Sequence, residues 1–247
     1  MGSVETEHAF QVFVKPVGAR CNLRCSYCYY LDKREIYPQE KTFVMPDHIL
    51  ERFIAQNIEA SADNTINFSW HGGEPLLAGI GFFRKAIEMQ KKYMPAGRSI
   101  LNGVQTNGTL IDSKWCSFFS ENGFSIGISI DGPAGMHDTN RITGNGNKTS
   151  DKVLRGYEML RNHNIPTEIL CVVNSGNVRQ PLVVYNFFKH LGARYITFLP
   201  LVNRMAGSVM GVTPDSVPSL DYGVFLSKIF DEWVEKDIGR ISIQVFE

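Results

Sequence analysis

The order of apolar and amphipathic segments constrains the fold of this chain most strongly. Short strand-like runs alternate with longer helix-like runs over almost the whole of its 247 residues. The segments with the apolar, β-branched and aromatic character of strands are 10–15, 65–70, 100–106, 124–130, 167–173, 194–199 and 241–246. The segments with helical spacing of apolar residues are 46–60, 80–93, 113–121, 150–164, 178–190 and 220–236, and a Gly, Pro and Ser-rich loop is expected over 202–219.

Strands separated by helices of this length indicate an α/β fold with a parallel sheet and right-handed crossovers. Such a repeat either opens into a doubly wound sheet or curls into a full or partial β/α barrel. Both arrangements bind ligands at the carboxyl ends of the strands. The unusual residues of this chain should therefore lie at strand ends.

Three cysteines, Cys21, Cys25 and Cys28, follow the first predicted strand with the spacing C-x3-C-x2-C. A structural zinc site and an ordinary [4Fe–4S] cluster each take four protein ligands, so three cysteines leave one corner of a cubane cluster open for a different ligand. The odd total of five cysteines and the polar start of the chain disfavour disulfides. Cys116 and Cys171 stand alone in apolar segments and are expected in the core.

Ligand-type residues follow three further strands. His71-Gly72-Gly73-Glu74-Pro75 follows segment 65–70, residues 105–109 (QTNGT) end the next strand, and residues 129–133 (SIDGP) end the one after that, before Arg141. Each of these motifs alone is also a common turn signal. Their recurrence at successive strand ends favours a binding site along that edge of the sheet.

Composition indicates a globular chain with a single domain over residues 1–247. Lys plus Arg and Asp plus Glu number 25 each, so no field of one sign points to nucleic acid or to an anionic membrane. No apolar run approaches the length that spans a bilayer. We expect a cytoplasmic protein, because free thiols of this kind require reducing conditions.

The cysteine motif followed by GGEP is similar to the radical S-adenosylmethionine (SAM) superfamily. The strings WHGGEPLLAG, QTNGTLID, SIDGPAGMHD-x-x-R and CVVN resemble the anaerobic sulfatase-maturating enzymes. The resemblance implies a partial (β/α)6 TIM-like barrel. It also implies that Cys21, Cys25 and Cys28 hold a [4Fe–4S] cluster whose fourth iron is chelated by SAM, and that reductive cleavage of SAM gives a 5′-deoxyadenosyl radical.

The resemblance also assigns contacts with SAM. Tyr27 matches the residue beside the adenine, Gly73 the backbone contact with the methionine amino group, and Glu74 a partner for that charge. Arg141 matches the cation that receives the methionine carboxylate, a role that suits a planar guanidinium. The remaining implied contacts are those of Ser129 with the ribose, of Gln105 with a polar group, and of Val202 near the adenine. Tyr27 as an anchor of its loop, Arg141 as a solvated arginine and His71 as a hydrogen-bonding residue stay open as alternatives.

In the enzymes that this chain resembles, a Cys or Ser side chain of a sulfatase peptide is oxidised to Cα-formylglycine, with electrons from a donor such as flavodoxin or ferredoxin. An acidic residue in an F-D pattern after the last strand is their proposed base. Here that pattern reads Phe246-Glu247, so Glu247 is the matching candidate.

The sequence departs from those enzymes in lacking a cysteine-rich C-terminal domain for two auxiliary clusters. We therefore expect SAM cleavage without efficient formylglycine formation from a chain of this length. Other radical SAM peptide-modifying enzymes, a glycyl-radical activase and a protein that binds metal only for structure remain alternatives.

Overall fold

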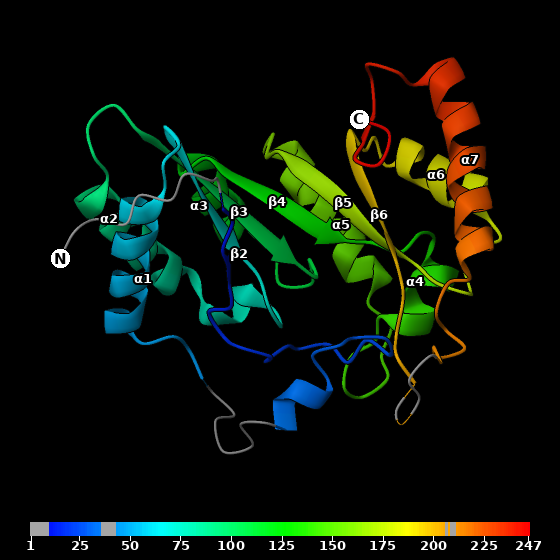
Figure 1. The fold of residues 1–247 in the computed structure, drawn as a ribbon, viewed down its shortest axis with the longest axis horizontal. Helices are drawn as coiled ribbons and strands as arrows, with labels where there is room; N and C mark the ends of the chain where they lie inside the picture. Colours follow the sequence, from blue (N-terminus) through cyan, green and yellow to red (C-terminus); the bar gives the residue numbers. More distant parts are fainter. Residues whose placement is uncertain (1–9, 36–42, 206, 208–210) are drawn as a thin grey trace.

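A seven-stranded parallel sheet forms the framework of the protein (Figure 1). The computed structural model describes residues 10–35, 43–205, 207 and 211–247. Its strands are β1 Phe13–Val14, β2 Thr65–Trp70, β3 Ser99–Thr106, β4 Phe124–Ser129, β5 Thr167–Val173, β6 Tyr195–Pro200 and β7 Ser242–Ile243. Its α-helices are α1 Asp47–Ala60, α2 Ile80–Tyr93, α3 Ser113–Glu121, α4 Ala134–Asn140, α5 Ser150–Asn162, α6 Pro181–His190 and α7 Ser219–Lys236. Two 3-10 turns, η1 Asp32–Glu35 and η2 Pro75–Ala78, complete the elements.

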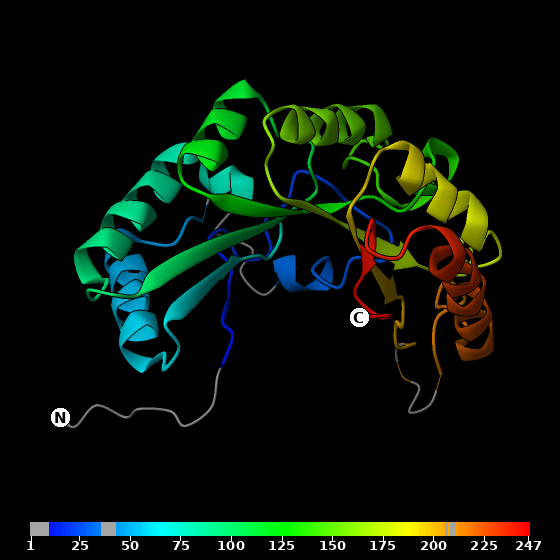
Figure 2. The same ribbon diagram turned by 90° about the horizontal axis from the view of Figure 1, so that it is seen from above.

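The strand order follows the chain, β1-β2-β3-β4-β5-β6-β7, and every pairing is parallel. A doubly wound sheet would reverse this order at a switch point, so the strand order decides for the barrel type. Figure 2 shows the sheet curved, with the helices along its convex outer side and η1 on the inner side. The expectation of a partial (β/α)6 barrel is confirmed, with the short β7 added after the sixth β/α unit.

One main core lies between the sheet and the outer helices. In β2 the side chains alternate, and Ile66, Phe68 and Trp70 are at most 1% exposed because they face the helices. The intervening positions of β2 face the concave side of the sheet. Cys116 and Cys171 are both fully buried in the same core, as the sequence predicts.

Two edge strands are shorter than predicted. β1 and β7 each contain two residues, because an edge strand pairs on one side only and loses its ladder as soon as the chain turns. After Ile243 the chain enters a turn in which the Phe246 amide donates to the Ile243 carbonyl at 2.8 Å. The prediction of a strand over 241–246 is therefore wrong beyond Ile243.

The short helix α4 lies in a segment that the sequence analysis did not assign to an element. Its first residues are Ala134 and Gly135, and its N-cap residue Pro133 makes no side-chain capping bond, so the segment lacks the usual helix start signal. The predicted loop over 202–219 falls partly on residues 206 and 208–210, outside the described residues; within the described part, Arg204 pairs with Val212. None of the described helices combines the length and the apolar character needed to cross a bilayer.

Candidate active site

The cysteine loop lies across the carboxyl ends of the strands (Figure 1). Asn22 donates to the Thr109 hydroxyl, beyond β3, at 2.8 Å, and the Ser26 amide donates to the Asn140 carbonyl, beyond β4, at 3.0 Å. Leu23 packs in a small apolar cluster with Leu201, which follows β6. The loop is thus held by segments that are far apart in the sequence and that share this edge of the sheet.

The three thiols of the loop form no disulfide bond within the described chain and lie in apolar surroundings. Cys25 is buried, Cys21 and Cys28 are partly buried, and all three pack with Leu23 and Tyr27. Burial raises the pKa of Cys21 to about 11 and also raises the pKa of Cys25. Because burial disfavours the charged thiolate, deprotonated cysteines at this place require a positively charged partner such as iron. Three reduced cysteines shielded from water are suitable ligands for a [4Fe–4S] cluster.

Within the part of the chain that the structure describes, no three His, Cys, Asp or Glu side chains are grouped as ligands of one metal ion. A cubane cluster does not need such a group, because each cysteine bonds a different iron atom.

The GGEP turn packs directly against the start of the cysteine loop. Gly73 has φ +47°, and a Cβ on it would lie 2.0 Å from the carbonyl oxygen of Arg20. The Glu74 amide donates to the same carbonyl oxygen at 2.8 Å. The glycine is therefore required by close backbone approach as well as by its left-handed conformation.

Glu74 joins the ends of two strands. It is fully buried, and its carboxylate accepts hydrogen bonds from the Thr106 hydroxyl at 2.8 Å and from the Asn107 amide at 2.7 Å. The Leu76 amide donates a third bond at 3.0 Å. Burial raises the pKa of Glu74 to about 7, against the opposing effect of these bonds. In this conformation the carboxylate is closed to any added ligand, which differs from the expected contact with the SAM amino group.

Asn107 extends this connection to the cluster ligands. Its side-chain amide donates to Asn22 Oδ1 at 2.9 Å and to Cys21 Sγ at 3.6 Å. A continuous set of bonds thus runs from Glu74 through Asn107 to the first cysteine.

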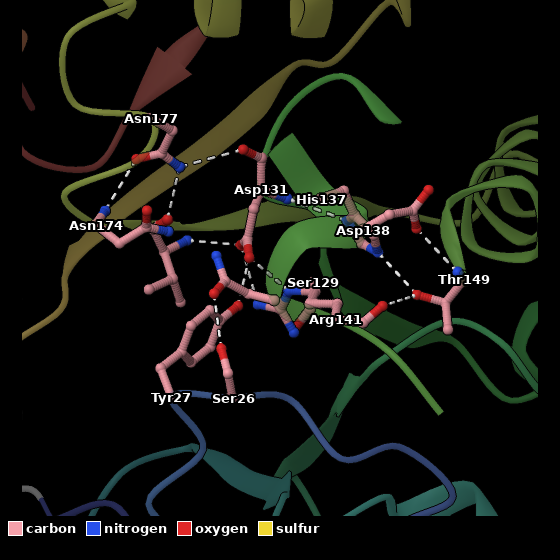
Figure 3. A network of polar contacts seen from close by, with 12 residues as sticks. Ser26, Tyr27, Ser129, Asp131, His137, Asp138, Arg141, Thr149, Asn174 and Asn177 are labelled. Atoms are coloured by element: carbon pink, nitrogen blue, oxygen red, sulfur yellow. Dashed lines mark hydrogen bonds and ion pairs between the residues drawn. The ribbon is translucent and has the colours of Figure 1, made fainter. Parts of the chain in front are cut away.

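A buried ion pair lies beside the cysteine loop (Figure 3). Asp131 is fully buried and accepts from Arg141 Nε at 2.9 Å and from Arg141 Nη2 at 3.1 Å. The Tyr27 hydroxyl also donates to Asp131, and the Arg141 guanidinium lies 5.5 Å from the centre of the Tyr27 ring. Arg141 is only 7% exposed, so the alternative of a solvated loop arginine is wrong.

The His-Asp pair before Arg141 fixes the backbone of this region. Asp138 accepts from the amides of Thr149 and Ser150, each at 2.9 Å, and so holds the start of α5. The Thr149 hydroxyl donates to the Arg141 carbonyl at 2.6 Å and contacts His137 Nε2 at 3.2 Å. Burial and, to a smaller extent, the charge of Arg141 lower the pKa of His137 to about 4. His137 is therefore neutral at pH 7.

Gln105 and Ser129 are neighbours on the concave side of the sheet. Gln105 Nε2 donates to the Ser129 hydroxyl at 3.2 Å, and a Cβ on Gly127 would lie 2.1 Å from Gln105 Oε1. Gln105 also borders a cavity of about 610 Å³ on this side. Other residues that line the cavity are Gln11, His71, Gly127, Glu168 and Gln244.

Two expected residues are not brought into this group. Val202 is 66% exposed, although it follows Leu201 of the apolar cluster around the cysteines. The Glu247 carboxylate accepts a hydrogen bond from Ser242, and Ser242 pairs with Tyr195, the first residue of β6. Glu247 therefore borders the cavity at the amino end of the strands, opposite the cysteine loop, because the chain turns after Ile243.

Comparison with known families decides the assignment. Residues 16–184, which contain the cysteine loop, the GGEP turn and the Asp131–Arg141 pair, match the radical SAM superfamily. The chain belongs to the radical SAM superfamily. The cofactors of this superfamily are a [4Fe–4S] cluster and SAM.

The radical SAM chain is similar to sulfatase-maturating enzymes. It is 43% identical to the serine-type anaerobic sulfatase-maturating enzyme of Bacteroides thetaiotaomicron, over 96% of this chain and 60% of that protein. It is 35% identical to the cysteine-type enzyme of Clostridium perfringens, over 96% of this chain and 64% of that protein. The chain thus spans about 60% of the length of the curated relatives it matches.

The radical SAM chain also resembles a solved structure described as native anSMEcpe with bound AdoMet and Cp18Cys peptide. The TM-score is 0.86 and the sequence identity is 34%, and the match covers 97% of this chain and 64% of that chain. The partial-barrel fold is therefore shared with an enzyme that was solved with its cofactor and a peptide.

Sequence reasoning missed two residues of this radical SAM site. Asp131 lies in the SIDGP string but is given no role by the sequence pattern, and Asn107 is there only part of a turn. A useful signal is the opposite charge of Asp131 and Arg141, which are ten residues apart and lie before and after α4. A buried arginine requires a partner, and Asp131 is the carboxylate at the same strand end.

Proposed function

We propose that this chain is a single radical SAM core domain that generates the 5′-deoxyadenosyl radical and removes a hydrogen atom from a Ser or Cys side chain of a sulfatase peptide, the first step of its oxidation to Cα-formylglycine. The observation that carries the proposal is the cysteine loop closed against the GGEP turn at the carboxyl edge of the sheet. The 43% identity to a serine-type sulfatase-maturating enzyme supports the choice of reaction within the superfamily.

In this proposal Cys21, Cys25 and Cys28 hold the [4Fe–4S] cluster. Together, the bound cluster and SAM supply reductive cleavage of the sulfonium and removal of a hydrogen atom from the substrate. The residues that would bind SAM are Tyr27, Gly73, Gln105, Ser129, Arg141 and, less enclosed, Val202. Glu74 serves instead to hold the GGEP turn against the end of β3, because its fully buried carboxylate accepts three hydrogen bonds from donors of the chain.

The concave cavity is the proposed place of the peptide. Its lining contains several amide side chains, among them Gln11, Gln105 and Gln244, which hydrogen-bond the backbone of an extended segment. The solved relative with a bound Cys peptide supports a peptide substrate. We assign no proton-accepting role to Glu247, because its carboxylate is bonded to Ser242 at the far end of the cavity.

The proposal also includes a one-electron donor such as flavodoxin or ferredoxin and a location in the reducing cytoplasm. The five cysteines form no disulfide bond within the described residues, which is consistent with such a compartment.

The test is anaerobic reconstitution with iron and sulfide, followed by addition of a reductant, SAM and sulfatase peptides that carry Ser or Cys at the target position. We expect 5′-deoxyadenosine and methionine in equal amounts, and transfer of deuterium to 5′-deoxyadenosine from a Ser peptide labelled at the target Cβ. An intact cluster without 5′-deoxyadenosine would overturn the enzymatic assignment. 5′-Deoxyadenosine that takes up no deuterium from the labelled peptides would reject the sulfatase substrate and favour another radical SAM reaction, such as glycyl-radical activation.

A further inference from the structure

We propose that Asp131 is a positioning residue for SAM, which acts by orienting Arg141 and Tyr27 toward the cofactor. This inference rests on the proposed function, because it concerns the same binding site. Asp131 follows β4 directly, Arg141 follows α4, and Tyr27 belongs to the cysteine loop (Figure 3). The Asp131 carboxylate thus bonds both Tyr27, which is expected beside the adenine of SAM, and Arg141, which is expected at the methionine carboxylate of SAM.

All four hydrogen bonds to the Asp131 carboxylate come from other segments. Oδ2 accepts from Arg141 Nε and from the Tyr27 hydroxyl, while Oδ1 accepts from Arg141 Nη2 and from the Val172 amide at 3.0 Å. Charge-assisted bonds of this kind are short and directional. Because the carboxylate is fully buried, no water molecule replaces a lost donor.

The geometry of the ion pair leaves one part of Arg141 available. Nε and Nη2 form the side of the guanidinium that faces Asp131, and no bond to Nη1 is found among the described residues. Nη1 is also not among the described side-chain atoms that are buried without a partner. Asp131 therefore fixes the plane of the guanidinium and leaves the Nη1 side to receive an added carboxylate.

The backbone of Asp131 is itself held in place. Its amide donates to His137 Nδ1 at 3.4 Å, and its carbonyl accepts from Asn177 Nδ2 at 3.3 Å. Asn177 Nδ2 also donates to the Val172 carbonyl at 2.9 Å, so the end of β4 is tied to the end of β5. The four hydrogen bonds that the described chain makes to the Asp131 carboxylate come from Arg141, Tyr27 and Val172, and its charge also acts on Cys25, so the test must follow the iron content as well as SAM binding.

Asp237 provides a matched control. It is 4% exposed, and its carboxylate accepts from the Tyr185 hydroxyl at 2.8 Å and pairs with Lys189 Nζ at 2.7 Å. The same combination of a buried carboxylate, a tyrosine and a cation is thus present at the α6–α7 contact, outside the cofactor site. A general loss of stability should affect Asp131→Asn and Asp237→Asn alike.

The experiment measures SAM binding to the reconstituted protein by equilibrium dialysis, together with iron content, the unfolding midpoint and the EPR spectrum of the reduced cluster with and without SAM. We expect Asp131→Asn to keep its iron but to bind SAM about 10-fold to 100-fold more weakly, the range seen when an orienting partner is removed. The spectral change on adding SAM should also need more SAM to appear. Asp237→Asn should keep the wild-type affinity at a lower unfolding midpoint.

The inference would be overturned if the Asp131→Asn variant folds, holds its iron and binds SAM with the affinity of the wild type. Should Asp131→Asn not fold, Tyr27→Phe removes only the hydroxyl bond to Asp131 and retains the ring. Weaker SAM binding by Tyr27→Phe then supports the inference, and unchanged binding rejects it. A wild-type protein that holds a cluster but does not bind SAM would instead reject the proposed function itself.

Discussion

The α-carbon of Gly73 lies so close to Arg20 that a Cβ at position 73 would stand 2.0 Å from the Arg20 carbonyl oxygen. This contact joins the turn after β2 to the first residues of the cysteine loop, and the Glu74 amide donates to the same carbonyl oxygen. Because the neighbouring atom belongs to the backbone, it has no alternative rotamer to adopt. The position of the loop and the absence of a side chain at residue 73 depend on each other.

Gly73→Ala should therefore displace the cysteine loop. We expect loss of the reconstituted cluster, with a stability cost of at least about 1 kcal/mol from the positive φ alone. Iron content and the unfolding free energy measure the two effects. The control is Gly81→Ala, since Gly81 lies on the exposed side of α2, where an added Cβ would meet no atom within 4 Å, and should be neutral or slightly stabilising. Full iron content in Gly73→Ala would contradict the contact.

Replacement of each loop cysteine should abolish the cluster. We expect Cys21→Ala, Cys25→Ala and Cys28→Ala to lose the iron–sulfur absorption and all 5′-deoxyadenosine formation, because a cubane held by two thiolates is not retained. Cys116→Ala is the comparison, because Cys116 is fully buried in the core, away from the loop. It should keep its iron at a cost of about 1 kcal/mol of stability. Iron retained by any of the three loop variants would remove that cysteine from the ligand set.

Gly127 should control the orientation of Gln105. A Cβ on residue 127 would lie 2.1 Å from Gln105 Oε1, which is the end of a flexible side chain. The Gly127→Ala variant should therefore fold, but Gln105 should move away from Ser129. We expect a higher KM for SAM with a normal iron content. In the neighbouring strand, a Cβ on Gly103 would be 3.4 Å from the Ser125 hydroxyl, so Gly103→Ala should retain the wild-type KM. Equal KM values for the two variants would argue against this role of Gln105.

His137 should make the protein less stable in acid. In the folded chain its pKa falls from an ordinary value of 6.5 to about 4, because burial and the charge of Arg141 outweigh the opposing effects of Asp131 and Asp138. The unfolded chain therefore binds a proton between these two values that the folded chain does not bind. The contribution of His137 to stability is fully present above pH 6.5 and is lost as the pH falls toward 4, by about 3 kcal/mol at most.

The measurement is the free energy of unfolding in denaturant at several pH values between 4 and 7.5, for the wild type and for His137→Gln. We expect the wild type to lose more stability on acidification than the variant, which has no titrating group at this position. Parallel curves for the two proteins would show that His137 titrates normally in the folded state.

Local patterns account for much of the fold. The period-two burial of β2 and the helical spacing of the outer helices are properties of short segments, so these elements and their order follow from the sequence. The ends of the sheet were less predictable, since β1 and β7 are limited by how many residues find a partner strand. Helix α4 has no side-chain cap at its start, and the first backbone bonds run from the Met136 and His137 amides to the Pro133 carbonyl.

The sequence by itself determined the parallel β/α repeat and the three cysteines on one loop, because both depend on residues that are near one another in the chain. Only the tertiary structure decided what the polar residues at the strand ends do. It closed Glu74 inside the protein, paired Arg141 with Asp131 and turned Glu247 away from the cysteine loop. The physical reason is that burial and hydrogen-bond partners come from segments distant in sequence, and no local pattern records which segments meet.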